Sequence, residues 1–372
     1  MVLEYTKILG RNTRSCVYGW LLCRWRGSIY KLLWRDLLAY IILYSIISCL
    51  YRFYLKDPHK KMFEDLVMQS ARYKNLVPVA LLLGFYVSLV VARWWASGLA
   101  MPDNTHTAIL LATHIPGNDS RAFEIRSRVI RYINLTCTMV FAHVSAAVHK
   151  KYPHPESLVT EHLATELEGR VLAEAEDHGC RDSKWLPLAW SCQLVHGARD
   201  EGFLQAGPGM EALVAEILNL QSQCRHLVEW HEFNVPLIYT QVVTIAVYTY
   251  FLFSLVSEQY LDESRHYPNY EVDLVVPVFA LLELVCCLGW LKVAQALLNP
   301  FGFDDQSFDL LRILEDTRHS GFVICHTRYG QYSAEAQWRP TDNSRMHIVD
   351  LGVLPGALGE ILTPDTVLGC SM

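Results

Sequence analysis

Four long stretches without a charged residue constrain this chain more than any other feature of its sequence. They cover residues 37–51, 75–92, 233–257 and 274–291, and only Glu283 interrupts the last of them. A helix that crosses a bilayer needs roughly 20 predominantly apolar residues. The composition agrees, because 52% of the residues are hydrophobic and only 19% are charged. We therefore predict an all-α, multi-pass membrane protein with transmembrane helices at about residues 36–55, 75–95, 233–257 and 273–293.

Charge and motifs narrow the class of protein further. The formal net charge of -6 argues against a nucleic-acid partner, because proteins that bind nucleic acids present a clearly basic face. The eleven cysteines form no C-x-x-C pair and fit no disulfide framework, so we expect buried free thiols. The sequence has no phosphate-binding loop, dinucleotide fingerprint or G-x-S-x-G motif. We therefore predict that the protein is not an enzyme and uses no organic cofactor.

The distribution of basic residues predicts the orientation in the membrane. An even number of spans places both termini on the same side. The segment before the first span is rich in Lys and Arg, whereas the charged residues of 258–273 are mostly acidic. The positive-inside bias therefore places both termini in the cytosol. Basic residues in the first loop point the other way: Lys56, Lys60, Lys61, Arg72 and Lys74.

The sequence outside the spans divides into a helical region and a tail. Within residues 96–231, apolar positions such as Ile125, Val129 and Ile133 recur at helical spacing among charged residues. We predict a cytosolic helical region there, with the sequons at Asn118 and Asn134 unused. From residue 309 to 372 the sequence is polar and aperiodic, which predicts a cytosolic tail, either loosely ordered or a packing arm, after a core of residues 1–308.

Two features of the spans have both an ordinary and a functional interpretation. Val77, Leu81 and Phe85 share one face of the second span. They form either an ordinary packing surface or an apolar constriction at the axis of an oligomer. Glu283 lies within the fourth span, where acids are costly and often functional. The alternative is a neutral side chain hydrogen-bonded between helices, because the spans offer no obvious charged partner.

Two groups outside the spans are candidate metal ligands. The oxygen-rich residues 299–309, which follow the fourth span, suit a hard cation such as calcium, but they also suit a solvated turn. His226, Glu229 and His231 suggest zinc, although the two histidines are five residues apart and point to different helix faces. Neither group matches a complete metal-binding motif.

Several segments, found in the same order, resemble the bestrophin family. They read RWRGSIYK at residues 24–31, GFYV at 84–87, RWW at 93–95, IYTQVVTIA at 238–246, GWLKVA at 289–294 and NPFG at 299–302. The resemblance implies a nearly all-helical homopentamer in the plasma membrane, with one axial pore that conducts chloride and other small anions when calcium binds. It implies a pore neck at Val77, Leu81 and Phe85.

The resemblance also implies a calcium clasp and shows where this chain departs from it. The clasp positions are Gly10, Ala296, Asn299, Asp304 and Ser307. Ser307 stands where the family has an aspartate, and Phe303 and Gln306 replace other acids. Calcium binding should therefore be weakened. Glu283 stands where the family tends to carry glutamine. Residues 207–210 stand where the family has a second, cytosolic constriction.

These departures leave a second interpretation open. The chain could be a non-conducting or regulatory subunit or scaffold that assembles like its relatives. A membrane-embedded zinc enzyme that uses His226 and His231 is a third interpretation.

Overall fold

The computed structural model describes residues 28–74, 76, 78–116, 119–180, 182–205, 207–262, 276–304 and 306–326. These residues form helices and loops, with no strand among them. Four helical segments are long and apolar enough to cross a membrane. They are α3 (Ile29–Cys49) with the π-helical turn Leu50–Tyr54, α5 (Val79–Leu99), α13 (Leu237–Ser257) and α14 (Val278–Leu297). The predicted all-α class and its four candidate membrane helices are confirmed.

The remaining helices connect and extend these four. They are α4 (Asp57–Lys74), α6 (Thr105–His114), α7 (Ser120–Val144), α8 (Ala146–Lys151), α9 (Pro155–Thr160), α10 (Glu166–Asp177), α11 (Leu186–Asp200) with a short 3₁₀ turn before it (Ser183–Trp185), α12 (Pro208–Glu232) and α15 (Leu310–His326).

Prolines determine where three of the membrane-length helices begin. Pro78, Pro236 and Pro277 directly precede α5, α13 and α14, and a proline ring is tolerated at a helix start but not in a helix interior. These helices therefore begin a few residues after the predicted spans. The first helix begins earlier than predicted, after Ser28, whose hydroxyl accepts a hydrogen bond from the Tyr30 amide at 3.1 Å.

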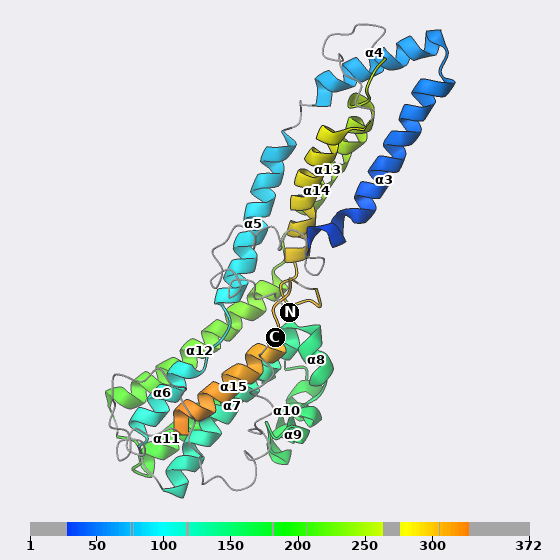
Figure 1. The fold of residues 1–372 in the computed structure, drawn as a ribbon. Coiled ribbons are helices and arrows are strands. Elements are labelled where there is room, and N and C mark those ends of the chain that lie inside the picture. Colours follow the sequence, from blue (N-terminus) through cyan, green and yellow to red (C-terminus); the bar gives the residue numbers. More distant parts are fainter. Residues whose placement is uncertain are drawn as a thin grey trace, which may run out of the picture. The chain divides into compact units, whose positions relative to one another are not determined.

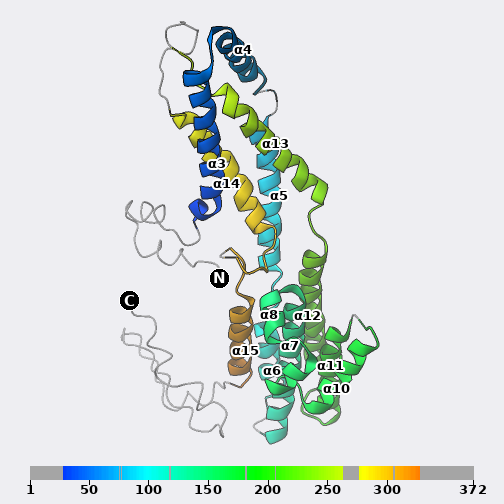
Figure 2. The ribbon, with the colours of Figure 1, turned by 90° about the vertical axis from the view of Figure 1, so that its right-hand side faces the viewer.

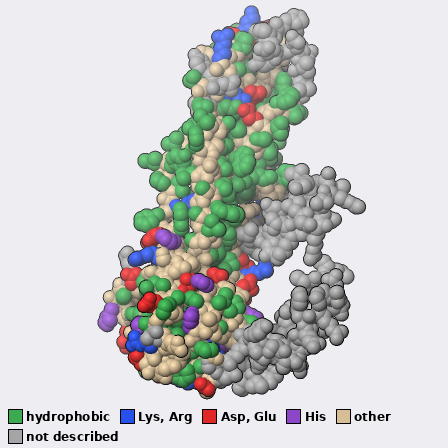
Figure 3. Space-filling view, turned by 90° about the vertical axis from the view of Figure 1, so that its left-hand side faces the viewer, with side chains coloured by type: hydrophobic (Ala, Val, Ile, Leu, Met, Phe, Trp, Pro, Cys, Tyr) green, Lys and Arg blue, Asp and Glu red, His purple; other side chains and the backbone are tan. Residues whose placement is uncertain are grey.

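The four membrane-length helices pack side by side (Figures 1 and 2). Their shared core contains Leu33, Tyr40, Leu83, Val247 and Leu288. Many other Leu, Ile, Val and Phe side chains on these helices are exposed, and Figure 3 shows hydrophobic side chains along the visible face of this bundle. An apolar exterior of this kind is suited to lipid, in which helices satisfy their own backbone groups.

A second core joins the helices outside the bundle. In α7, Ile125, Val129 and Ile133 are fully buried in it, which confirms the amphipathic helix predicted from their spacing. Helices α6, α11 and α12 pack around α7. Charged and histidine side chains gather on the visible surface of this region in Figure 3.

After residue 309 the sequence left two alternatives, a loose tail or a packing arm, and residues 310–326 follow the second. They form α15, which packs on α6 and α7. Its buried residues Leu310, Leu314, Gly321 and Cys325 lie on one helical face. The rest of the expected tail lies outside the described residues.

Candidate pore and cation sites

Leu81 and Phe85 project from a face of α5 that the rest of the described chain leaves uncovered. They are 57% and 62% exposed, and no atom lies within 4 Å of the place where a Cβ on Gly84 would stand. Ser88 and Ala92, further along the same face, are exposed as well. This face is therefore free to line an apolar passage or to meet other copies of the chain.

The opposite face of α5 holds the helix in the bundle. Leu83, Tyr86 and Val90 are buried there, and the Tyr86 hydroxyl donates to Thr240 Oγ1 of α13 at 3.4 Å. The structure thus brings two of the three predicted neck residues onto one exposed face. Val77, the third, lies outside the described residues.

Arg93 ties the other end of α5 to the junction between α12 and α13. Its guanidinium donates to the carbonyl oxygens of Trp230 and Phe233 and lies over the Trp230 ring, 5.6 Å from the centroid. The last carbonyls of a helix have no partner within the helix, so Arg93 satisfies acceptors at the end of α12. The sequence does not reveal this contact, because the residues are about 140 positions apart.

The loop after α14 is folded tightly on itself. The buried Ser307 donates its hydroxyl to the Asn299 carbonyl at 3.4 Å, and its amide donates to the Asp304 carbonyl at 3.0 Å. A Cβ on Gly302 would lie 3.2 Å from Asn299 Nδ2 and 3.3 Å from Ser307 Oγ, so any other residue there would crowd both side chains. The Phe308 ring stacks on Trp94 of α5 with centroids 4.6 Å apart.

This loop brings together part of the predicted calcium clasp. Asn299, Asp304 and Ser307 lie in it, Ala296 lies in the last turn of α14, and Gly10 lies outside the described residues. The Asp304 side chain is exposed. Within the described part of the chain, no three His, Cys, Asp or Glu side chains are close enough to hold a metal ion.

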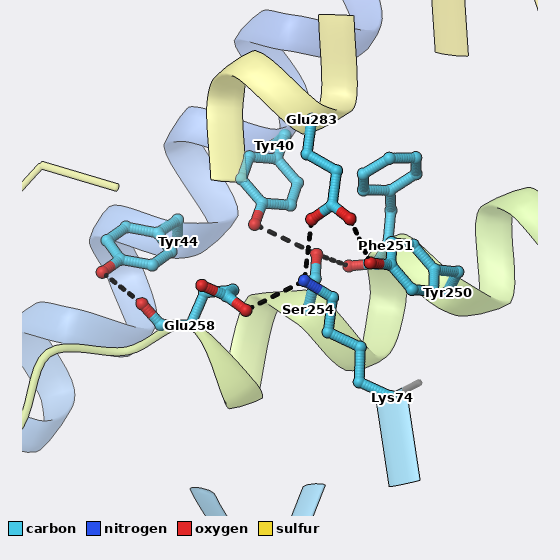
Figure 4. Close-up of polar contacts among 8 residues, drawn as sticks. All are labelled: Tyr40, Tyr44, Lys74, Tyr250, Phe251, Ser254, Glu258 and Glu283. Atoms are coloured by element: carbon cyan, nitrogen blue, oxygen red, sulfur yellow. Dashed lines mark hydrogen bonds and ion pairs between the residues drawn. The ribbon is translucent and has the colours of Figure 1, made fainter. Parts of the chain in front are cut away.

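Glu283 belongs to a polar cluster between α4, α13 and α14 (Figure 4). Its Oε2 atom pairs with Lys74 Nζ at 2.7 Å, and its Oε1 atom accepts a hydrogen bond from the Tyr250 hydroxyl. Lys74 Nζ also pairs with Glu258 Oε1 at 2.9 Å. Glu283 therefore has a charged partner, which comes from α4 and not from one of the four spans.

The partner escapes sequence analysis because it lies in a loop helix and not in a span. Lys74 is 209 residues from Glu283 in the sequence. In the sequence, nothing distinguishes Lys74 from the other basic residues of the first loop. Burial alone would lower the pKa of Lys74, but its bonds to Glu283, Glu258 and Tyr250 raise the pKa above the ordinary value. Lys74 is thus a permanent cation at the edge of the bundle.

Proteins of known family are similar to this chain in sequence, and solved structures are similar to it in fold. The family model described as "Bestrophin, RFP-TM, chloride channel" matches residues 1–327. Mouse bestrophin-2 is 39% identical over 309 residues, which are 83% of this chain and 60% of that protein. Human bestrophin-1 is 38% identical over 310 residues, which are 83% of this chain and 52% of that protein. The chain therefore spans between about half and two thirds of these relatives' length.

A solved structure supports the same assignment at the level of the fold. A bacterial bestrophin homolog from Klebsiella pneumoniae aligns with a TM-score of 0.54 at 15% identity, over 78% of this chain and 98% of that one. Since the family model covers most of the sequence and the animal relatives are nearly 40% identical, the chain belongs to the bestrophin family.

Proposed function

We propose that this chain is the subunit of a plasma-membrane anion channel, assembled as a homopentamer around one axial pore, that conducts chloride and other small anions passively. The observation that carries the proposal is the exposed face of α5, where the side chains of Leu81 and Phe85 are 57% and 62% exposed. Five such faces around an axis would form an apolar neck. The name of the matching family model, a chloride channel, supports the same function.

An apolar neck of this kind discriminates ions without a fixed positive charge. Hydrophobic constrictions gate by losing their water, and the edge of an aromatic ring carries a partial positive charge. A ring of Phe85 edges would therefore favour anions over cations. Selectivity among anions would follow the cost of dehydration, so large, weakly hydrated anions should pass readily.

Cysteine substitution tests the neck directly. In a background without reactive native cysteines, Leu81→Cys and Phe85→Cys should change conductance or gating when a charged thiol reagent is added. Leu83→Cys is the matched control, because Leu83 is buried on the opposite face of the same helix. If neither neck variant responds, or if the Leu83 variant responds equally, the assignment fails.

Calcium would bind in the loop after α14, more weakly than in a fully acidic clasp. The chain would supply oxygens from Asn299, Asp304 and Ser307, with backbone carbonyls from Gly10 and Ala296. Affinity for calcium depends strongly on the number of charged ligands. Ser307 contributes a hydroxyl that already donates to the Asn299 carbonyl. Opening would therefore need a higher calcium concentration than a fully acidic clasp needs, or would not depend on calcium.

The same observation favours a second candidate, a regulatory or non-conducting subunit. A loop closed by a Ser307–Asn299 hydrogen bond suits a chain that assembles but does not respond to calcium. Reconstitution separates the two functions, because the purified chain alone carries anion current only if it is itself a channel. For the zinc-enzyme alternative, His226 lies 3.4 Å from Glu229, but the described residues contain no group of three His, Cys, Asp or Glu side chains that could hold a metal ion.

Both termini and the helices α6 to α12 would lie in the cytosol. Asn134 is buried in α7 and its Oδ1 accepts a hydrogen bond from Asn104 at 2.8 Å, so a glycan at this sequon is incompatible with the fold. A more direct test is a cysteine at the exposed Glu166. It should resist a membrane-impermeant reagent in intact cells and react after permeabilisation, whereas labelling of intact cells would reverse the orientation.

A further inference from the structure

The last residue of α4 connects three parts of the membrane bundle. Lys74 Nζ lies 2.7 Å from Glu283 of α14 and 2.9 Å from Glu258, which directly follows α13. It also lies 4.9 Å from the centre of the Tyr250 ring, and Tyr250 itself donates to Glu283. Figure 4 shows these side chains converging on the Lys74 ammonium group.

The two acids are held by firmly packed elements. Glu258 follows a segment tied to α3, because Tyr40 and Ser254 share a hydrogen bond of 3.1 Å and the Tyr44 hydroxyl donates to the Glu258 carbonyl at 3.0 Å. Glu283 stands next to the buried Leu284 on α14, which packs on both α3 and α5. The acids therefore act as fixed points, to which Lys74 is attached.

Lys74 stands directly before the helix that carries the exposed neck face. The helix α4 ends at Lys74 and α5 begins at Val79. The amides of Leu81 and Leu82 donate to the Pro78 carbonyl at 3.0 and 3.1 Å, so Leu81 belongs to the first turn of α5. Only four residues, 75–78, separate Lys74 from the start of α5.

The burial of Lys74 gives the link its strength. Its side chain is only 9% exposed, whereas those of Glu283 and Glu258 are 38% and 34% exposed. Removing either acid leaves the Lys74 ammonium group without one of its two carboxylates, which is more disruptive than losing a fully exposed pair. The end of α4 cannot move away from α13 and α14 without exposing or unpairing these groups.

We propose that Lys74, through Glu283 and Glu258, positions the first turn of α5 and thereby sets the balance between conducting and non-conducting arrangements of the neck. This inference rests on the proposed channel function. Lys74 acts as a positioning residue, since it holds the neck helix in place without lining the exposed face. In the assembled channel, the Leu81 side chains of the subunits would form a ring around the axis. Widening or rotating this ring must move α5 relative to the fixed acids, so the ion pairs of Lys74 favour the arrangement of the neck in which they stay intact.

A double-mutant cycle on single-channel recordings tests the link. The variants are Lys74→Met, Glu283→Gln and the two combined. Each single variant should shift open probability in the same direction by about fivefold or more, the lower end of typical coupling effects. The double variant should shift it no further than the larger single effect, because one interaction is lost only once. Lys74→Arg, which keeps the charge, should stay near the unmodified protein.

The ion pair between Lys60 and Asp262 is the matched control. It joins the same helix α4 to residues after α13 with an N–O distance of 2.9 Å, but it lies 14 residues earlier than Lys74. Lys60→Met should lower thermal stability and leave open probability unchanged. A purely structural role for Lys74 would give the same result in both lysine variants.

The outcomes separate this inference from the proposed function. Additive effects in the cycle, or an unchanged open probability in Lys74→Met, would overturn the positioning role while leaving the channel intact. If the unmodified protein carries no current, the channel proposal fails, and hydrogen exchange of the amides in the first turn of α5 then decides. Faster exchange in Lys74→Met than in Lys60→Met supports the positioning role, and equal exchange overturns it.

Discussion

At the scale of single residues, an ion pair in the helical region makes a prediction about pH. The Arg131 guanidinium contacts both carboxylate oxygens of Glu168, at 2.6 and 2.9 Å, and the Tyr132 hydroxyl donates to the same carboxylate at 2.7 Å. Glu168 also caps α10 by accepting from the Thr165 amide at 2.8 Å. Burial would raise the pKa of Glu168, but these hydrogen bonds lower the pKa from 4.5 to about 2.

This lowered pKa makes folding stability depend on pH in a defined direction. As the pH falls, Glu168 takes up a proton in the unfolded chain before it does so in the folded chain. Its contribution to folding stability is therefore complete above pH 4.5 and is lost as the pH falls towards 2. The Tm of the unmodified protein should therefore drop more than that of Glu168→Gln when the pH is lowered from 6 to 3.5. An equal drop in the two proteins would show that Glu168 does not contribute.

Ser307 makes a second prediction at this scale. An aspartate in its place would put a carboxylate inside the loop, close to the Asn299 carbonyl that now accepts from Ser307 at 3.4 Å. The added charge is unfavourable without a cation and favourable with one, so Ser307→Asp should open at lower calcium concentrations. Asp304→Ala should abolish any calcium dependence. If the unmodified protein opens fully at submicromolar calcium and falls silent in chelator, the weakened-clasp account is wrong.

At the scale of elements, the contact between α15 and α6 predicts a sensitive glycine. A Cβ on Gly321 would lie 2.5 Å from the amide of Asn104, which is fully buried and donates to Asn134 at 2.8 Å. Gly321→Ala should destabilise the fold by about 1–3 kcal/mol, as overpacking usually does. Gly197→Ala in α11 is the control, because no atom lies within 4 Å of its Cβ position, and its Tm should be unchanged or higher. A Tm for Gly321→Ala equal to that of the unmodified protein would contradict this packing.

Elements that depend on long local patterns were predictable from the sequence. Four apolar stretches define four helices, and the spacing of Ile125, Val129 and Ile133 defines the buried face of α7. Helix α15 was missed because six polar residues, 315–320, separate its apolar residues in the sequence. The Lys74–Glu283 pair was missed because tertiary contacts between distant positions leave no local pattern.

At the scale of the whole molecule, the proposed function requires more than one chain. Leu81 and Phe85 are exposed on the face of α5 opposite its packed side, so the proposed neck would form only between several copies, and a closed ring would make each copy contact its neighbours in the same way. We expect a reconstructed map of the purified particle to show five subunits with Phe85 at the axis. A different subunit number would change the pore radius, and Phe85 facing lipid would remove the neck.

The current through the purified protein tests the central claim most directly. In a planar bilayer with a potassium chloride gradient, the account predicts a current that reverses near the chloride equilibrium potential and is altered by thiol modification of Phe85→Cys but not of Leu83→Cys. The absence of current from correctly assembled protein, or a current that reverses near the potassium equilibrium potential, would contradict it.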